Sequence, residues 1–88
     1  MIARMWEARA AAGRIEDLVA AVRAYRIGLA LRAGYAGGEM YRADGPDPRV
    51  VLITRWADRA AADAAPGPPA DEALHARPPH AWDFVPVL

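Results

Sequence analysis

The stretch from Gly34 to Asp58 constrains the fold of this 88-residue chain more than any other part of it. It begins at a glycine of the kind that ends helices, and an extended segment follows as far as Arg42. Aspartate, glycine and proline over residues 44–48 form a turn, and the β-branched segment Val50–Thr54 leads through a tryptophan to an aspartate that can cap a helix. This order predicts a helix end, two strands in a hairpin and a helix start.

The first third of the chain predicts a strand and then an amphipathic helix. As a strand, residues 2–8 would place Ile2, Arg4, Trp6 and Ala8 on one face and Ala3, Met5 and Glu7 on the other, each a mixture of apolar and polar side chains. The next apolar residues are spaced 3, 4, 3 and 4 apart, as on one face of a helix, and they are Ile15, Leu18, Val22, Tyr25 and Leu29. We expect Arg32 in the last turn of this helix and Gly34 as its left-handed cap.

The last third predicts a broken helix and an edge strand. Asp58 is a candidate N-cap for a short helix over residues 59–65, and a second helical piece over 70–77 would project Leu74 inward. Prolines separate these pieces from each other and from a last strand over 82–87. The proline within that strand predicts either a sheet edge or the end of a strand.

Two features specify the sheet more closely. Gly37-Gly38 near the start of the second strand predicts a bulge or a close backbone approach. The Val50–Thr54 segment is apolar on both faces, which is typical of a central strand covered on both sides. One face carries Val50, Leu52, Thr54 and Trp56, and the other carries Val51, Ile53 and Arg55.

The fold class is therefore α+β, with a ferredoxin-like β-α-β-β-α-β antiparallel sheet in a single domain over residues 1–88. Two helices can cover only one face of such a sheet, and the other face still carries large apolar side chains. A chain this short also gains much from a partner, because small domains bury a limited share of their surface. We therefore expect a homodimer that pairs through the sheet faces.

Composition excludes several functions. Acidic and basic residues balance to zero net charge with no basic stripe, so no nucleic acid partner is expected. The absence of cysteine excludes disulfides, a thiolate nucleophile and cysteine-ligated metal. Charges interrupt the apolar stretches and no export signal opens the chain, so we expect no membrane partner and a cytoplasmic location.

Three segments together resemble the antibiotic biosynthesis monooxygenase family of dimeric α+β barrels: Ala3–Glu7, Ala33–Glu39 and Val51–Asp58. Family members include oxygenases that use no metal or flavin and oxidise electron-rich polycyclic phenols. The resemblance implies a cofactor-independent monooxygenase-like enzyme acting on an aromatic or polyketide-type small molecule. A related branch degrades haem with an asparagine, a tryptophan and a histidine, but here only His75 is in place, because Ala65 stands at the tryptophan position and strand one offers no asparagine.

Such an oxygenase needs a base, aromatic walls and a partner for a developing anion. His75 is the candidate catalytic base, since imidazole titrates near neutral pH and can accept a phenolic or carbon-acid proton. The candidate substrate-binding residues are Trp6, Tyr41, Trp56, Arg55 and Arg4. The ordinary alternatives are that the aromatic residues fill the core and the dimer interface, that His75 is an exposed helix-end residue, and that the arginines form salt bridges with Glu39 or Glu7. His75 and His80 lack further ligands, so no metal site is expected.

Two other functions remain open from the sequence. The same order of elements occurs in non-catalytic ligand-binding or regulatory dimers, and fold alone does not separate them from enzymes. The chain could also be an interaction or stability partner for another biosynthetic protein. A cavity of about 300 Å³ or more, the low end for small-molecule sites, would favour the enzyme if His75 and Trp56 both line it.

Overall fold

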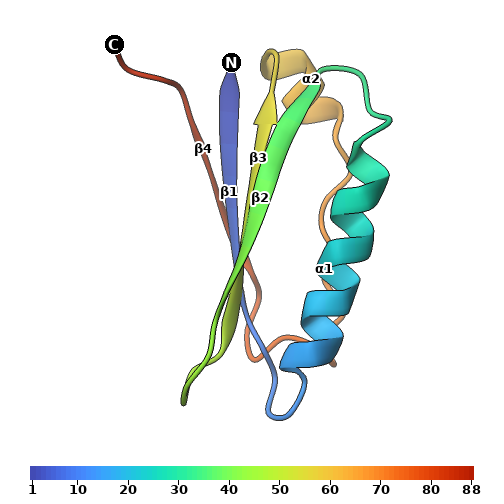
Figure 1. Ribbon diagram of the computed structural model, residues 1–88, viewed down its shortest axis with the longest axis vertical. Coiled ribbons are helices and arrows are strands. Elements are labelled where there is room, and N and C mark those ends of the chain that lie inside the picture. The colour runs from blue at the N-terminus through green and yellow to red at the C-terminus, as the bar shows by residue number, and fades with distance from the viewer.

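A four-stranded antiparallel sheet carries both helices on one of its faces (Figure 1). The computed structural model describes residues 1–88. The elements are β1 (Ile2–Arg9), α1 (Ile15–Leu29), β2 (Tyr35–Ala43), β3 (Arg49–Trp56), α2 (Arg59–Ala64) and β4 (His80–Phe84). The strand order is β2-β3-β1-β4 and each neighbouring pair is antiparallel, so the predicted α+β, ferredoxin-like class is confirmed.

Helix α1 follows the predicted apolar stripe but ends earlier than expected. Leu18, Val22 and Leu29 are buried against the sheet, and Glu16 and Asp17 lie in the first turn, where the helix dipole favours acidic side chains. The helix ends at Leu29, because the Ala30 and Arg32 N–H groups donate to the carbonyls three residues back. The prediction that Arg32 lies in the last turn and that Gly34 caps the helix is therefore wrong.

Gly34 instead allows a close approach to α2. It has a φ of +79°, and a Cβ added to it would lie 2.4 Å from the Cβ of Ala61. Its carbonyl accepts the Ala57 N–H at 2.8 Å, which ties the turn before β2 to the residue that follows β3. Glycine is required here both for backbone conformation and for space.

The two glycines of β2 form the predicted irregularity. The pairing register between β2 and β3 shifts between Tyr35 and Gly38, and Gly37 has a φ of +101°. A Cβ on Gly38 would lie 2.3 Å from the Ile53 carbonyl oxygen. The bulge therefore lets β2 pass very near β3.

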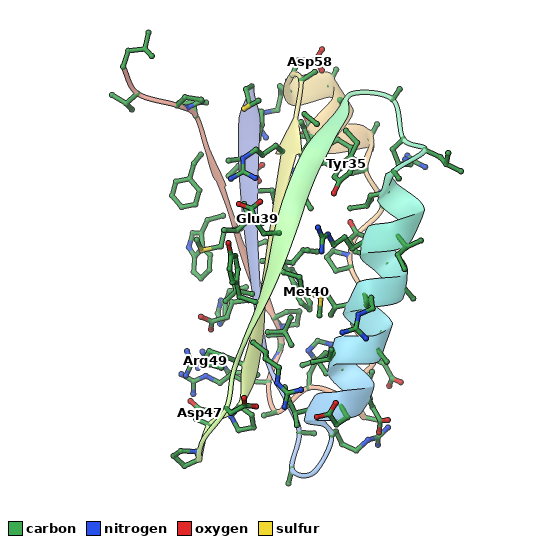
Figure 2. The ribbon with its side chains drawn as sticks, in the orientation of Figure 1. Tyr35, Glu39, Met40, Asp47, Arg49 and Asp58 are labelled. Atoms are coloured by element: carbon green, nitrogen blue, oxygen red, sulfur yellow. The ribbon has the colours of Figure 1, made fainter.

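Strand β3 separates two environments. Its side chains at Val50, Leu52, Thr54 and Trp56 are buried beneath the helices, and those at Val51, Ile53 and Arg55 lie partly exposed on the other face. Figure 2 shows the same alternation on β2, where Met40 points towards α1 and Glu39 points away from it. The predicted assignment of these side chains to two faces of β3 is confirmed. Within the single chain, helices cover only the face that carries Leu52 and Trp56.

Helix α2 begins as predicted at Asp58, whose Oδ1 accepts the Ala61 N–H at 2.8 Å. The predicted helical piece over residues 70–77 is absent. Backbone hydrogen bonds instead join this segment to the end of β1. The Ala11 N–H donates to the Leu74 carbonyl, and the Ala76 N–H donates to the Arg9 carbonyl. Leu74 is buried as expected, because these bonds hold the segment against the core, where it forms a turn over residues 72–74.

Strand β4 pairs only with β1 and is an edge strand, as the proline near its end predicts, although it spans His80–Phe84 rather than 82–87. Arg4 holds it in place, with Nε donating to Asp83 Oδ1 at 2.7 Å and Nη2 donating to Oδ2 at 2.9 Å. Arg59 of α2 donates to the same carboxylate at 2.7 Å. The two guanidinium groups, Arg4 foremost, lower the pKa of Asp83 to about 2.

The sheet face opposite the helices is open and largely apolar. In Figure 1 no helix lies on this side of the strands. Tyr41, Trp82 and Phe84 are each about half exposed. The strand registers place them on the same face as Met5 and Ile53, with Met5 opposite both Ile53 and Trp82.

Candidate active site

His75 lies where the segment between α2 and β4 crosses the end of β1. Its backbone forms an isolated antiparallel bridge with Ala10, and its side chain is only 8% exposed. The imidazole meets the indole of Trp6 edge to face, with ring centroids 6.0 Å apart and planes at 90°. The alternative that His75 is an exposed residue at a helix end is therefore wrong, because the side chain is buried and the segment is not helical.

The hydrogen bonds of His75 define its tautomer. Nε2 lies 3.1 Å from the carbonyl oxygen of Pro69. Because a carbonyl only accepts, Nε2 is the nitrogen that carries the proton in the neutral ring, which leaves Nδ1 with a free lone pair. Nδ1 is buried and has no hydrogen-bond partner. Buried polar atoms without partners are uncommon and point to a functional role or to a missing ligand.

A cavity of about 330 Å³ adjoins this histidine. It is lined entirely by the segment between α2 and β4, through Ala70, Glu72, His75, Arg77, Pro78 and Pro79. The prolines give it a stiff apolar rim, because their rings fix the backbone. Arg77 also lies near Glu7, with 3.7 Å between Arg77 Nη2 and Glu7 Oε1. The cavity reaches the size of small-molecule sites.

Trp56 does not line this cavity or either of the other two that the structure contains. It is 1% exposed, packs with Ile2, Leu29 and Ala62, and donates from Nε1 to Thr54 Oγ1 at 3.0 Å. The expected cavity lined jointly by His75 and Trp56 is therefore absent. The polar end of the indole is satisfied within the core.

The two candidate arginines form ion pairs. Arg55 donates through both Nη atoms to Glu39, with 2.9 Å between Nη2 and Oε1, and this guanidinium holds the pKa of the Glu39 carboxyl below its usual range. Arg4 bonds to Asp83 and donates from Nη1 to the Ala62 carbonyl at 2.8 Å. Both arginines therefore form salt bridges, as the alternative held. Glu39 is the expected partner of Arg55, whereas Arg4 pairs with Asp83 rather than with Glu39 or Glu7.

Of the six residues predicted from the sequence, the structure brings the rings of His75 and Trp6 together. Tyr41 is 56% exposed with its side chain on the open sheet face, and only its place in β2 puts it at the border of a separate groove between α1 and β2. Arg23 and Arg26 line that groove from α1 and were not predicted as site residues. Their spacing of three residues on the helix, off its apolar stripe, was the available signal. Glu72 and Arg77 were missed because no spacing rule places a loop residue beside His75.

No three or more His, Asp or Glu side chains come together in a way that could hold a metal ion. Neither helix has the length and apolar content needed to cross a lipid bilayer.

Residues 1–77 match the family model described as antibiotic biosynthesis monooxygenase. No protein of curated function matches the chain in sequence. Among solved structures, PA3566 from Pseudomonas aeruginosa is similar at a TM-score of 0.83 and 18% identity, covering 99% of this chain and 94% of that chain. Rv0793 from Mycobacterium tuberculosis has a TM-score of 0.82 and 19% identity, covering 98% and 94%.

A mutant form of SnoaB, a cofactor-independent oxygenase from Streptomyces nogalater, is similar at a TM-score of 0.75 and 17% identity, covering 97% of this chain and 92% of that chain. Identities this low show a shared fold. They leave the chemistry to be argued from the site of this chain.

Proposed function

Because the chain belongs to the antibiotic biosynthesis monooxygenase family, we propose that it is a small cofactor-independent monooxygenase that acts on an aromatic or polyketide-type molecule. One observation carries the proposal: a buried histidine beside a 330 Å³ cavity holds one ring nitrogen with no hydrogen-bond partner. The oxygenase activity of SnoaB, a relative in fold, supports the reaction class.

In this proposal His75 Nδ1 accepts a proton from the substrate. The Pro69 carbonyl keeps the other nitrogen protonated and orients the ring, while the edge-to-face contact with Trp6 limits its rotation. Nδ1 is shielded from solvent, so substrate entry requires a small movement of the segment that lines the cavity. The shielding also keeps water from the lone pair before the substrate arrives.

The reaction balances without a cofactor. Loss of a proton from an activated CH₂ carbon gives a carbanion, which transfers one electron to dioxygen, and the resulting radical and superoxide combine to form a carbon–oxygen bond. The protonated His75 returns its proton to the peroxide anion. The O–O bond then breaks as the second C–H proton leaves, which yields a ketone and one water molecule.

Dioxygen uptake with an anthrone as substrate tests this proposal. We expect the wild-type protein to consume dioxygen above the buffer rate, and His75→Ala to lose about 100-fold of that rate, the usual contribution of a general base. His80→Ala is the matched control, because His80 is exposed on β4 and stacks on Trp82. Wild-type uptake at the buffer rate, or equal losses in both variants, would contradict the proposal.

We also propose that two copies pair through the open sheet faces. Tyr41, Trp82 and Phe84 leave a large apolar area uncovered in the single chain. The side chains that flank it are ion-paired within the chain, as Arg55 is with Glu39 and Arg49 is with Asp47, so pairing leaves few charges without a partner. The cytoplasmic location remains a prediction from the sequence.

A non-catalytic, ligand-binding or regulatory dimer is the second candidate. It is favoured by the structural roles of Arg4, Arg55 and Trp56, which are held in ion pairs or in the core. It predicts that a phenolic ligand protects the protein from thermal unfolding without any dioxygen uptake.

A further inference from the structure

We infer that the groove between α1 and β2 binds a small organic carboxylate with a flat apolar body. This inference does not rest on the proposed function, because the groove shares no lining residue with the His75 cavity. Two adjoining hollows, of about 400 and 190 Å³, form the groove. Arg23 and Arg26 line both of them, so these two arginines stand where the hollows meet.

Helix and strand each supply one wall. Arg23, Arg26 and Ile27 lie on the side of α1 that faces β2, and Tyr35 and Met40 of β2 point towards the helix (Figure 2). Strand β2 is the outer strand of the sheet, so nothing covers this groove from the side. The bulge at Gly37-Gly38 widens it, because neither residue places a side chain there.

The positive charge in the groove is not neutralised. Arg23 forms no hydrogen bond and no ion pair, and Arg26 donates only to the Gly38 carbonyl, at 2.8 Å from Nη2. Arg42 at one end is already paired with Glu16 and Asp44. The charge of Arg26 contributes a little to the lowered pKa of the Glu39 carboxyl, after the larger effect of Arg55. The Glu39 carboxylate is nevertheless paired with Arg55 on the opposite face of the sheet.

This combination defines the ligand by its chemistry. A guanidinium offers five N–H donors in a planar fork that matches a carboxylate, and all five of Arg23 and most of those of Arg26 are unused. Ile27 is 69% exposed, and with Tyr35 and Met40 it offers apolar surface for the remainder of the molecule. A carboxylate on a flat apolar body fits both parts of the groove.

Titration with 2-naphthoate, followed by ¹⁵N NMR, tests this site. We expect shifts in α1 and β2 and a dissociation constant of about 1 mM, which is ordinary for a ligand of this size. Arg23→Gln is expected to weaken binding about tenfold, because it removes charge-assisted hydrogen bonds. Arg32→Gln is the matched control, since Arg32 also lacks a carboxylate partner but bonds to Ala64 outside the groove.

Two further comparisons complete the experiment. The neutral 2-naphthamide should bind at least tenfold more weakly than the naphthoate, and His75→Ala should leave naphthoate binding unchanged whether or not it abolishes dioxygen uptake. Equal losses in the Arg23 and Arg32 variants would overturn the inference, as would equal affinity for the amide. Shifts confined to the open sheet face or to the His75 segment, or no shifts at all, would overturn it too.

Discussion

The sheet depends on Gly38 because this position has no room for a side chain. A Cβ there would meet the Ile53 carbonyl oxygen at 2.3 Å and the Tyr35 hydroxyl at 3.2 Å, and the first of these is backbone that cannot move alone. Gly38→Ala should therefore force β2 away from β3 and lower the free energy of unfolding by about 1–3 kcal/mol, as overpacking does. Urea unfolding followed by tryptophan fluorescence measures this change.

Gly28→Ala is the matched control for Gly38. Gly28 lies in α1 with nothing within 4 Å of an added Cβ and with an ordinary φ. Alanine there should raise the stability by about 1 kcal/mol, because glycine is a poor helix former. If both alanine variants are stabilised, the close approach at Gly38 is not a feature of the folded protein.

Single residues also show where sequence reasoning succeeds and fails at the site. Glu39 could be named with Glu7 as a possible partner for Arg55, because side chains that share a face of adjacent strands can reach each other, here diagonally, since Glu39 lies opposite Ile53. The contact of His75 with Trp6 joins residues far apart in sequence through a segment without regular structure. No periodicity reports such a contact, so the environment of His75 could not be derived from the sequence.

At the scale of elements, β4 is held to the sheet by an ion-paired carboxylate as well as by its ladder with β1. The Arg4 and Arg59 guanidinium groups lower the pKa of Asp83 to about 2. A carboxyl with a lowered pKa in the folded state stabilises the protein above its unfolded pKa of about 4 and loses that contribution as the pH falls through its folded value.

Asp83→Asn should therefore lower the free energy of unfolding by about 1–2 kcal/mol at pH 7, a range that allows for solvent screening. The difference from wild type should shrink between pH 4 and pH 2, which chemical denaturation across this range measures. Asp63→Asn is the control, because Asp63 meets Arg59 at 3.5 Å with its side chain 62% exposed. A difference that stays constant with pH would contradict the role of the Asp83 charge.

The elements that were predicted well are those whose apolar spacing matches their own period. Helix α1 and strand β3 bury one regular face each, so their position and orientation follow from the sequence. The helix predicted over residues 70–77 is absent although alanine and charged residues fit a helix locally, because bonds to Arg9 and Ala11 hold the segment as a turn against β1. Tertiary hydrogen bonds overrode local propensity there.

At the scale of the whole molecule, the open sheet face leads to a prediction about assembly. Ile53 lies at its centre, opposite Met5 on β1 and Glu39 on β2. Ile53→Glu should convert a dimer into a monomer, because a buried charge without a partner costs several kcal/mol. Light scattering coupled to size exclusion gives the mass of each form.

Ile27→Glu controls for the added charge, since Ile27 is exposed on α1 away from this face. It should remain a dimer. A wild-type protein that is monomeric at high micromolar concentration would refute pairing through the sheet. So would an Ile53 variant that remains a dimer.

The bare sheet face could be predicted from the sequence, whereas the residues that line the cavity could not. Two helices on a four-stranded sheet leave one face bare, which follows from element order alone. Which aromatic side chains reach a cavity does not follow, because the same residue types fill cores, interfaces and pockets. Trp56 belongs to the core, Trp82 lies on the bare face, and Trp6 contacts the candidate base.

The role of His75 as a base is tested most directly by the ratio of dioxygen uptake rates of wild type and His75→Gln on two anthrone substrates. One substrate should be neutral at the assay pH. The other should carry electron-withdrawing groups that lower its pKa below the assay pH, so that it is already ionised in solution. We predict a loss of about 100-fold in the variant on the neutral substrate and less than threefold on the ionised one, because the ionised substrate needs no base. Equal losses on both substrates, or no loss on the neutral one, would contradict the role assigned to His75.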